Sequence, residues 1–321
     1  GWQVRANNIV VLGTGGTIAG TAAQAGDNVG YQAAQLSVQA LLDAVPGLAQ
    51  AACGPLQAEQ VAQIDSKDMD VGIWRALAAR CAVLLADARV RGIVITHGTD
   101  TLEETAWFLH SVLAACKPVV LTCAMRPATA LAPDGPQNLR DAVVVAAEPG
   151  VQGVLVVAAG TVHGAREVQK VHPYRVDAFD SGDVGPLGWI EEGVVRWARN
   201  MPPALSQKAL AAIESVALEC DWPRVDIVFS HAGADGAIVD ALVASGTQGI
   251  VVAATGNGTL HRALQAALAR AQAAGVSVRV ASRCPLGRVL PRSDSPFPDA
   301  GGLSPVKARV ALQLELLQRQ P

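Results

Sequence analysis

Short apolar runs rich in β-branched residues alternate along the chain with longer segments whose apolar positions recur with a helical period. This alternation predicts βαβ units and mainly parallel sheets. All but the last of these runs lead into loops rich in Gly, Thr, Ser, Asn or His. In open α/β sheets ligands bind at the carboxyl ends of the strands, so these loops should converge on a site. Strands are expected at residues 9–12, 92–96, 119–123, 154–158, 225–229, 250–254 and 276–281.

Helix starts are also visible in the polar positions. Thr101 and Glu104 in "TLEE" have the spacing of a capping box, in which each side chain bonds a backbone N–H of the other residue. Asp68 is expected to cap the helix that carries Trp74. Ser304, followed by proline, is expected to open the last helix.

The same patterns divide the chain into two α/β domains with mainly parallel sheets, a larger N-terminal one and a smaller C-terminal one. We predict an N-terminal catalytic domain at residues 1–200 and a C-terminal domain at 223–321, because a strand pattern restarts there. The linker between them, 201–222, contains "NMPP" and a helix-like stretch at 204–219.

Composition excludes several classes of function. The 321 residues are 50% hydrophobic and 17% charged, with a formal net charge of -3 and no run of Lys or Arg, so nucleic-acid binding is not expected. No apolar stretch approaches the roughly 18 residues that cross a bilayer, so we expect a soluble protein with no membrane partner. The N-terminus lacks the apolar segment of a secretory signal, as a processed chain would, which leaves cytoplasm and periplasm open. The six cysteines form no C-x-x-C pair and the histidines lack metal-ligand spacing, so neither a metal nor a cofactor is expected.

The first predicted strand leads into a loop of glycine and threonine, "VVLGTGGTIAG" at residues 10–20. Its spacing differs from the dinucleotide-binding pattern G-x-G-x-x-G, and no P-loop lysine follows. The segment after it carries glycines and small polar residues as far as Tyr31, so the helix N-terminus that would bind a phosphate is missing. We therefore interpret the loop as a tight, exposed turn that presents the hydroxyls of Thr14 and Thr17.

A second strand-end loop, "ITHGTDTLEET" at residues 95–105, supplies groups that a hydroxyl nucleophile needs. A threonine hydroxyl attacks only when a base lies within hydrogen-bond reach. This loop places His97, Thr99 and Asp100 at the mouth of the sheet. Spacing alone leaves plainer interpretations open: Thr14 as a turn residue, Asp100 as a helix cap, and His97 as a buried structural histidine instead of a triad member.

Taken together, "TGGTIAG" at residues 14–20 and "THGTDTLEETA" at 96–106 resemble the two signature motifs of the bacterial L-asparaginases. These are amidohydrolases that act on L-asparagine and, to varying degrees, on L-glutamine. The resemblance extends from about residue 10 to residue 317. The "AMRP" stretch and Tyr31 are closer to the type II branch than to the cytosolic type I branch. Other similar segments are "AMRPATALAPDGPQNL", "GAREVQKVH", "GPLGWI", "GNGTL" and "SPVKARVALQL".

The resemblance implies roles for five residues. Thr14 matches the nucleophile of the family, and Tyr31 matches a tyrosine on a flexible lid that helps to activate it. Thr99, Asp100 and Lys170 match a polar triad, in which the lysine takes a proton and the aspartate holds it or binds the substrate ammonium. The implied course is ping-pong: Thr14 attacks the side-chain amide, ammonia leaves, and water hydrolyses the acyl-enzyme to aspartate. Backbone N–H groups of the Thr99 loop are expected to meet the oxyanion.

The resemblance also implies a substrate-binding loop, "IDSKDM" at residues 64–69. Ser66 matches a carboxylate-binding serine. At the next position, where the family often has Gln or Glu, this chain has Lys67, a cation that would repel the substrate ammonium unless it turns to Asp65 or Asp68. A neighbouring subunit completes the site in the family, with Thr259 at a position that is commonly asparagine and Asp294 at a position that is commonly acidic. The substrate-binding residues implied are thus Asp65, Ser66, Lys67, Thr99, Asp100, Ala124, Thr259 and Asp294.

Three functions are consistent with these observations. The first is an L-asparaginase without cofactor, assembled as a homotetramer built from dimers. The second is the same scaffold acting on glutamine or another amide, including the subunit that supplies ammonia for tRNA-dependent amidation, which usually has an added N-terminal domain and a basic face. The third is a catalytically silent amino-acid-binding protein, which Lys67 suggests. The joint presence of the five catalytic matches argues against the third.

Overall fold

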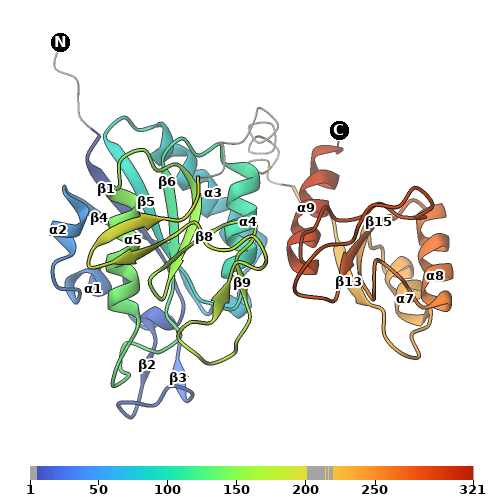
Figure 1. The fold of residues 1–321 in the computed structure, drawn as a ribbon, viewed down its shortest axis with the longest axis horizontal. Coiled ribbons are helices and arrows are strands. Elements are labelled where there is room, and N and C mark those ends of the chain that lie inside the picture. Colours follow the sequence, from blue (N-terminus) through green and yellow to red (C-terminus); the bar gives the residue numbers. More distant parts are fainter. Residues whose placement is uncertain (1–5, 201–213, 215, 217–219, 321) are drawn as a thin grey trace. The chain divides into compact units, whose positions relative to one another are not determined.

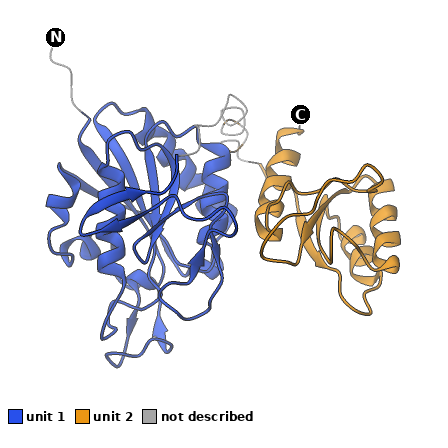
Figure 2. Cartoon of the chain, viewed as in Figure 1, with its two compact units in different colours: residues 1–213 blue, residues 214–321 orange. Residues whose placement is uncertain are grey.

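The computed structural model describes residues 6–200, 214, 216 and 220–320, and the chain divides into two units (Figure 2). Unit 1 comprises residues 1–213 and unit 2 residues 214–321. The predicted arrangement of two α/β domains, the larger one N-terminal, is confirmed. Most of the predicted linker, with the helix-like stretch at 204–219, lies outside the described residues. Within the part of the chain that is described, every helix is too short or too polar to span a bilayer.

Unit 1 is built on an eight-stranded sheet with the order β12-β11-β8-β7-β6-β5-β1-β4 (Figure 1). The strands from β4 to β7 are parallel, and the edge from β8 to β12 is antiparallel. Two short antiparallel pairs, β2 with β3 and β9 with β10, lie outside this sheet. The strands are β1 (Asn8–Gly15), β2 (Thr21–Ala22), β3 (Tyr31–Gln32), β4 (Leu56–Ile64), β5 (Val90–Thr96), β6 (Pro118–Thr122), β7 (Gly153–Ala158), β8 (Thr161–Gly164), β9 (Gln169–Lys170), β10 (Phe179–Asp180), β11 (Gly188–Glu191) and β12 (Val194–Trp197).

The helices of unit 1 cover both faces of the sheet (Figure 1). Helix α5 packs with α2 on one face, and α3 packs with α4 on the other. The connections β5-α4-β6 and β6-α5-β7 step in the same direction along the sheet over opposite faces, so they have opposite hands. About 98% of such crossovers are right-handed, and the other crossovers of this sheet have the same hand as the one through α4. The crossover through α5 is therefore the left-handed one. The helices are α1 (Val38–Asp43), α2 (Leu48–Ala52), α3 (Val71–Ala86), α4 (Leu102–Val112) and α5 (Gly135–Ala147), with the 3-10 turns η1 (Thr17–Ala19) and η2 (Ser66–Asp68).

The central strands match the predicted ones. Strands β1, β5, β6 and β7 are the four apolar runs expected in this half of the chain, and β6 is buried at every position, as a central parallel strand should be. Strand β4 and the antiparallel edge were not predicted. The sequence of β4, "LQAEQVAQI", interrupts its apolar positions with Gln and Glu because it lies at the edge of the sheet, where one side has no neighbouring strand.

One predicted helix cap is wrong and another differs in its contact. Asp70 caps α3 by accepting a hydrogen bond from the backbone N–H of Ile73 at 2.9 Å, whereas Asp68 belongs to the turn η2. Thr101 precedes α4 as expected, but its hydroxyl makes no capping bond and donates to the carbonyl oxygen of Ser66 at 2.8 Å. In both cases the loop after β4 takes part in a contact that the local pattern did not reveal.

Unit 2 is a three-stranded parallel sheet in the order β13-β14-β15. One hydrophobic cluster lies under α7 and α8, and a second lies where α9 packs on the other residues of these strands. All three strands were predicted, and Ser304 does open α9, followed by a proline in its first turn. The elements are β13 (Val225–Phe229), β14 (Gly249–Ala254), β15 (Ser277–Ser282), α7 (Ala237–Ala244), α8 (Arg262–Ala273) and α9 (Pro305–Gln318).

A glycine contact sets the spacing between the loops that follow β1 and β5. Gly16 has a φ of 84°, in the left-handed region, and a Cβ placed on it would lie 2.5 Å from the Cα of Gly98. Its own N–H donates to the carbonyl oxygen of Ile64, at the end of β4, at 2.9 Å. The loop after β1 is therefore held between its two neighbours by backbone alone.

We expect Gly16→Ala to lower the free energy of unfolding by about 3 kcal/mol or more, because the new methyl group must push the Gly98 backbone away. The measurement is urea unfolding followed by circular dichroism. Gly150→Ala is the matched control: its φ is 80°, but an added Cβ meets nothing within 4 Å. That variant should lose only about 1–2 kcal/mol. Equal losses would show that the backbone angle, and not the contact with Gly98, sets the effect.

Candidate active site

The carboxyl ends of four adjacent strands, β4, β1, β5 and β6, bring four polar loops to one edge of the sheet of unit 1. This is the convergence that the strand pattern predicted. Strands β4 and β5 flank β1 on opposite sides. The chain first passes from β1 to β4, and then crosses over β1 to reach β5, so the direction of strand addition reverses at β1. In parallel sheets, ligands bind at such a reversal of strand order.

Thr14 lies within β1, next to its last residue, and is only 1% exposed. Its hydroxyl donates to the carbonyl oxygen of Thr96, the last residue of β5, at 2.6 Å. The expectation of an exposed turn is therefore wrong for Thr14, and also for Thr17, which is buried in η1. The reason is that β1 is an inner strand, whose end is enclosed by the loops on both sides. As expected, no α-helix follows the glycine loop before Tyr31.

Tyr31 lies on the hairpin formed by β2 and β3, which extends away from the sheet (Figure 1). Its hydroxyl is hydrogen-bonded to the hydroxyl of Thr17 at 2.7 Å. The hairpin is fixed by Thr129, whose hydroxyl accepts from the N–H of Ala22 at 3.0 Å and whose carbonyl oxygen accepts from the N–H of Gly26 at 3.1 Å. The predicted lid is thus docked on the loop that follows β6.

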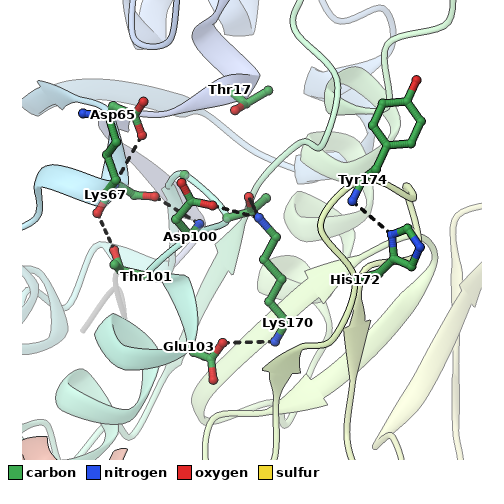
Figure 3. A network of polar contacts seen from close by, with 12 residues as sticks. Thr17, Asp65, Lys67, Asp100, Thr101, Glu103, Lys170, His172 and Tyr174 are labelled. Atoms are coloured by element: carbon green, nitrogen blue, oxygen red, sulfur yellow. Dashed lines mark hydrogen bonds and ion pairs between the residues drawn. The ribbon is translucent and has the colours of Figure 1, made fainter. Parts of the chain in front are cut away.

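Lys170 contacts both Thr99 and Asp100, as the resemblance implied. Figure 3 shows its side chain reaching Asp100. Its ammonium group donates to the Thr99 hydroxyl oxygen and to one Asp100 carboxylate oxygen, each at 2.8 Å. The Lys170 side chain is 17% exposed and that of Asp100 is 51% exposed, so the pair lies at the surface of the site with its cation the more enclosed. A lysine nitrogen at hydrogen-bond distance from a hydroxyl can exchange a proton with it.

The loop after β4 directs its lysine away from the centre of the site. The Lys67 ammonium donates to the Asp68 carboxylate at 2.7 Å, and this hydrogen bond is the main cause that raises the pKa of Lys67. Asp65 accepts from the backbone N–H of Lys67 at 3.3 Å and so caps η2. The sequence left Asp65 and Asp68 open as partners of Lys67, and the ammonium group forms its ion pair with Asp68. The negative charges of Asp65 and, more weakly, of Asp100 also raise the pKa of Lys67.

Ser66 joins this loop to the loop after β5. It is buried, its hydroxyl oxygen accepts from the backbone N–H of Asp100 at 3.1 Å, and its carbonyl oxygen accepts from Thr101. Because the Asp100 N–H is used here, it is not available to an oxyanion. Ser66 therefore orients the segment that carries two of the groups around Lys170.

Ala124 lies in the loop after β6 and is fully buried. Asp134, the residue before α5, shapes this loop by accepting from the backbone N–H groups of Met125 at 2.9 Å and Arg126 at 3.0 Å. Asn138 of α5 donates to the carbonyl oxygen of Cys123 at 2.9 Å. The start of α5 thus fixes the backbone on both sides of Ala124.

His97 is a buried structural group and not a triad member. One ring nitrogen, Nδ1, lies 2.6 Å from the Gly98 carbonyl oxygen and the other, Nε2, lies 2.8 Å from the Thr105 hydroxyl. Burial lowers the pKa of His97 to about 4, so the ring is neutral at pH 7. A carbonyl oxygen only accepts, so Nδ1 carries the proton and Nε2 accepts from Thr105, which in turn accepts from the indole N–H of Trp74 at 2.9 Å.

Thr259 and Asp294 belong to unit 2, where each has local partners. The Thr259 hydroxyl donates to the carbonyl oxygen of Thr255 at 2.9 Å. Asp294 pairs with Arg292 at 2.7 Å, and the hydrogen bond from Arg292 lowers the pKa of that carboxyl group. Both residues are exposed.

The cysteines take no part in this arrangement. All six are free thiols. Burial raises the pKa of Cys81 to about 12 and raises that of Cys123 further, so both thiols stay protonated at neutral pH. Among the described residues, no three His, Cys, Asp or Glu side chains form a group that could hold a metal ion.

The chain matches two family models that together cover most of its length. Residues 8–203 match the model described as "Asparaginase, N-terminal", and residues 224–320 match the "Glutaminase/Asparaginase C-terminal domain". The chain belongs to the asparaginase family. The two matched segments fall one in each unit of the asparaginase fold described above.

Individual members of the asparaginase family are similar over nearly the full chain. "L-asparaginase 2" of Escherichia coli strain K12 is 40% identical, over 97% of this chain and 89% of that protein. A "Glutaminase-asparaginase" of Pseudomonas fluorescens biotype A is 36% identical, over 98% of this chain and 87% of that protein. The crystal structure of a "Probable Cytoplasmic L-asparaginase" from Campylobacter jejuni aligns with a TM-score of 0.90 at 39% identity, covering 96% of this chain and 94% of that one.

Two residues that shape this asparaginase site were not predicted from the sequence, and the role of a third was not recognised. Glu103 accepts from the backbone N–H of Lys170 at 3.1 Å, and Thr129 fixes the hairpin of Tyr31. Thr17 was noted only as a turn residue, although it is the partner of the Tyr31 hydroxyl. The one signal for Glu103 is that an acidic residue occupies a buried position in the first turn of α4, and its burial is known only from the structure. Thr129 has no local signal, because its partners lie about a hundred residues earlier.

The lowered pKa of His97 should make unit 1 less stable in acid. An unfolded histidine binds a proton near pH 6.5 and the folded one near pH 4, so the stabilisation is complete above pH 6.5 and is lost as the pH falls toward 4. The full effect is about 3 kcal/mol. His97→Asn can still donate to Gly98 but does not titrate, so its free energy of unfolding should fall less between pH 7 and 4.5. Urea unfolding at the two pH values measures this, and an unchanged pH dependence would contradict the assignment.

Proposed function

We propose that this chain is an L-asparaginase that hydrolyses L-asparagine to L-aspartate and ammonia through an acyl-enzyme on Thr14. Membership of the asparaginase family and the names of its relatives support the reaction. The observation that carries the proposal is the placement of Lys170 against both Thr99 and Asp100, at the same sheet edge as Thr14. This set provides a nucleophile, a proton acceptor and a carboxylate in one place.

In the first half of the reaction, the Thr14 oxygen attacks the carbon of the substrate's side-chain amide. The hydroxyl now donates to the Thr96 carbonyl oxygen, which is too weak a base to remove the proton. Tyr31 from the hairpin or Lys170 from the Thr99 side therefore takes it. Because an ammonium group cannot accept a proton, Lys170 acts as acceptor only after it has given one proton to Asp100 or to water. The proton then passes on to the amide nitrogen. The tetrahedral oxyanion is met by the backbone N–H of Thr99, since that of Asp100 is bonded to Ser66. The amide nitrogen is protonated and leaves as ammonia.

In the second half, water attacks the ester of Thr14 and releases aspartate. The Thr99 hydroxyl oxygen and the Lys170 Nζ lie 2.8 Å apart. A water molecule next to the Thr99 hydroxyl can therefore pass its proton toward Lys170. The Asp100 carboxylate keeps that lysine in place and offers its exposed side to the substrate ammonium. Neither half requires a metal or a cofactor.

The rest of the substrate-binding assignment belongs to the same proposal. Ser66 lies at the α-carboxylate, with Asp65 beside it in the same loop and Ala124 in the loop after β6. Thr259 and Asp294 complete the site from another subunit of a homotetramer built from dimers. Their exposure in unit 2 is compatible with this arrangement. Glutamine is the second candidate substrate, since one relative is named a glutaminase-asparaginase.

Ammonia release from asparagine and glutamine tests the reaction and its nucleophile. The wild-type chain should release ammonia, and Thr14→Ala should lower kcat by about 10⁴-fold, as expected when a nucleophile is removed. Thr161→Ala, on the strand β8 of the same sheet, is the matched control and should keep wild-type activity. A fully active Thr14→Ala would overturn the assignment of Thr14. Activity in a dilute sample that is shown to be monomeric would overturn the shared site.

The Lys67–Asp68 ion pair predicts an unusual pattern of KM values for asparagine. Since Asp68 already holds the lysine, Lys67→Gln should change KM by about twofold at most, as for a solvent-exposed pair. Asp68→Asn should raise KM by about fivefold or more, because the freed cation is then attracted only by Asp65 and, more weakly, by Asp100, and it opposes the substrate ammonium near Asp100.

The double variant, Lys67→Gln with Asp68→Asn, is the control for this prediction. It removes the cation together with its partner, so KM should return to the wild-type value. Steady-state ammonia release over a range of asparagine concentrations gives all four values. A double variant as impaired as Asp68→Asn would mean that Asp68 acts on the substrate directly and not by holding Lys67.

A further inference from the structure

The backbone of Lys170 has an unusual partner. Lys170 lies opposite Phe179 in the short β9–β10 pair, where the next residue, Val171, donates to Ala178 at 2.7 Å. The N–H of Lys170 instead donates to a carboxylate oxygen of Glu103 on α4, at 3.1 Å (Figure 3). The carboxylate thus joins a two-residue strand to the first turn of a long helix.

Lys170 is held at both ends by one segment of the chain. Thr99 and Asp100 accept from the ammonium group, and Glu103 accepts from the backbone N–H. All three acceptors lie within the five consecutive residues 99–103, which run from the loop after β5 into the first turn of α4, so the chain keeps them close together. Figure 3 shows the Lys170 side chain extended between Glu103 and Asp100.

From this geometry we propose that Glu103 is a positioning residue for Lys170, and this inference rests on the function proposed above. A lysine side chain is flexible, so its nitrogen stays at a fixed point only when the backbone end is also fixed. Glu103 is 7% exposed, which keeps water from competing for the backbone N–H. Its carboxylate oxygen acts by accepting the Lys170 N–H at the distance that the length of the Glu103 side chain sets. Its negative charge is not the essential property.

Two substitutions separate distance from charge. Glu103→Gln removes the charge but keeps an oxygen acceptor at the same reach, whereas Glu103→Asp keeps the charge but withdraws the acceptor by one methylene group. We expect kcat for ammonia release from asparagine to stay within about threefold of wild type in Glu103→Gln and to fall by about 10- to 100-fold in Glu103→Asp, with little change in KM. Glu191→Gln, at an exposed ion pair with Arg196, is the control and should match wild type.

The reverse order, with Glu103→Asp active and Glu103→Gln impaired, would overturn the proposal in favour of a role for charge. Wild-type kcat in both variants would also overturn it. A wild-type chain that releases no ammonia would instead refute the proposed function, and this outcome is separate because it needs no variant.

Hydrogen–deuterium exchange at the Lys170 amide tests the positioning without any activity. The amide should exchange slowly in the wild-type chain and in Glu103→Gln, and at least about tenfold faster in Glu103→Asp, because only the last variant loses the acceptor. Thermal unfolding of the same samples checks that the change is local. Fast exchange in Glu103→Gln, or slow exchange in Glu103→Asp, would show that the Glu103 side chain does not hold this N–H by its reach.

Discussion

The site depends on the close approach of two backbones, at Gly16 after β1 and Gly98 after β5. A side chain at Gly16 would separate the loops, because even a Cβ would lie 2.5 Å from the Gly98 Cα. The same loop is tied to β4 through Ile64, and Thr14 is tied to β5 through Thr96. Two main-chain contacts and one hydrogen bond from the Thr14 hydroxyl therefore hold three parallel strand ends together, and this places that hydroxyl beside the Thr99 loop.

The two lysines beside these strand ends form short-range ion pairs with aspartates. Each lysine of the site has one aspartate as its ion-pair partner: Lys170 lies 2.8 Å from Asp100 and Lys67 lies 2.7 Å from Asp68. The two pairs differ in exposure, since the Lys170 side chain is largely enclosed and that of Lys67 is open to water. An enclosed cation keeps its geometry better than an exposed one, whose attraction water and salt screen. This difference suits Lys170 to chemistry and leaves Lys67 as a group that must be kept aside.

The left-handed crossover through α5 also bears on the site. It places α5 on the face that carries α2, and the residue before the helix, Asp134, then holds the backbone around Met125 and Arg126. The loop so shaped reaches back to the hairpin of Tyr31 through Thr129. A rare topology thus links the end of β6 to the segment that the family uses as a lid.

The sequence by itself determined the inner strands, the polar loops at their ends and the absence of a helix after the glycine loop, because these follow from the period and composition of neighbouring residues. The pairing of Lys170 with Thr99 and Asp100 came from the family resemblance and agrees with the geometry. Only the tertiary structure decided that Thr14 is buried, that Asp70 and not Asp68 caps α3, and that Glu103 holds the backbone of Lys170. These contacts join segments up to 82 residues apart or depend on which loop lies beside which. Strand order and register choose the distant partners, and no local pattern encodes them. The Asp70 cap is different, because its partner Ile73 lies only three residues away and what decided it was where the helix begins.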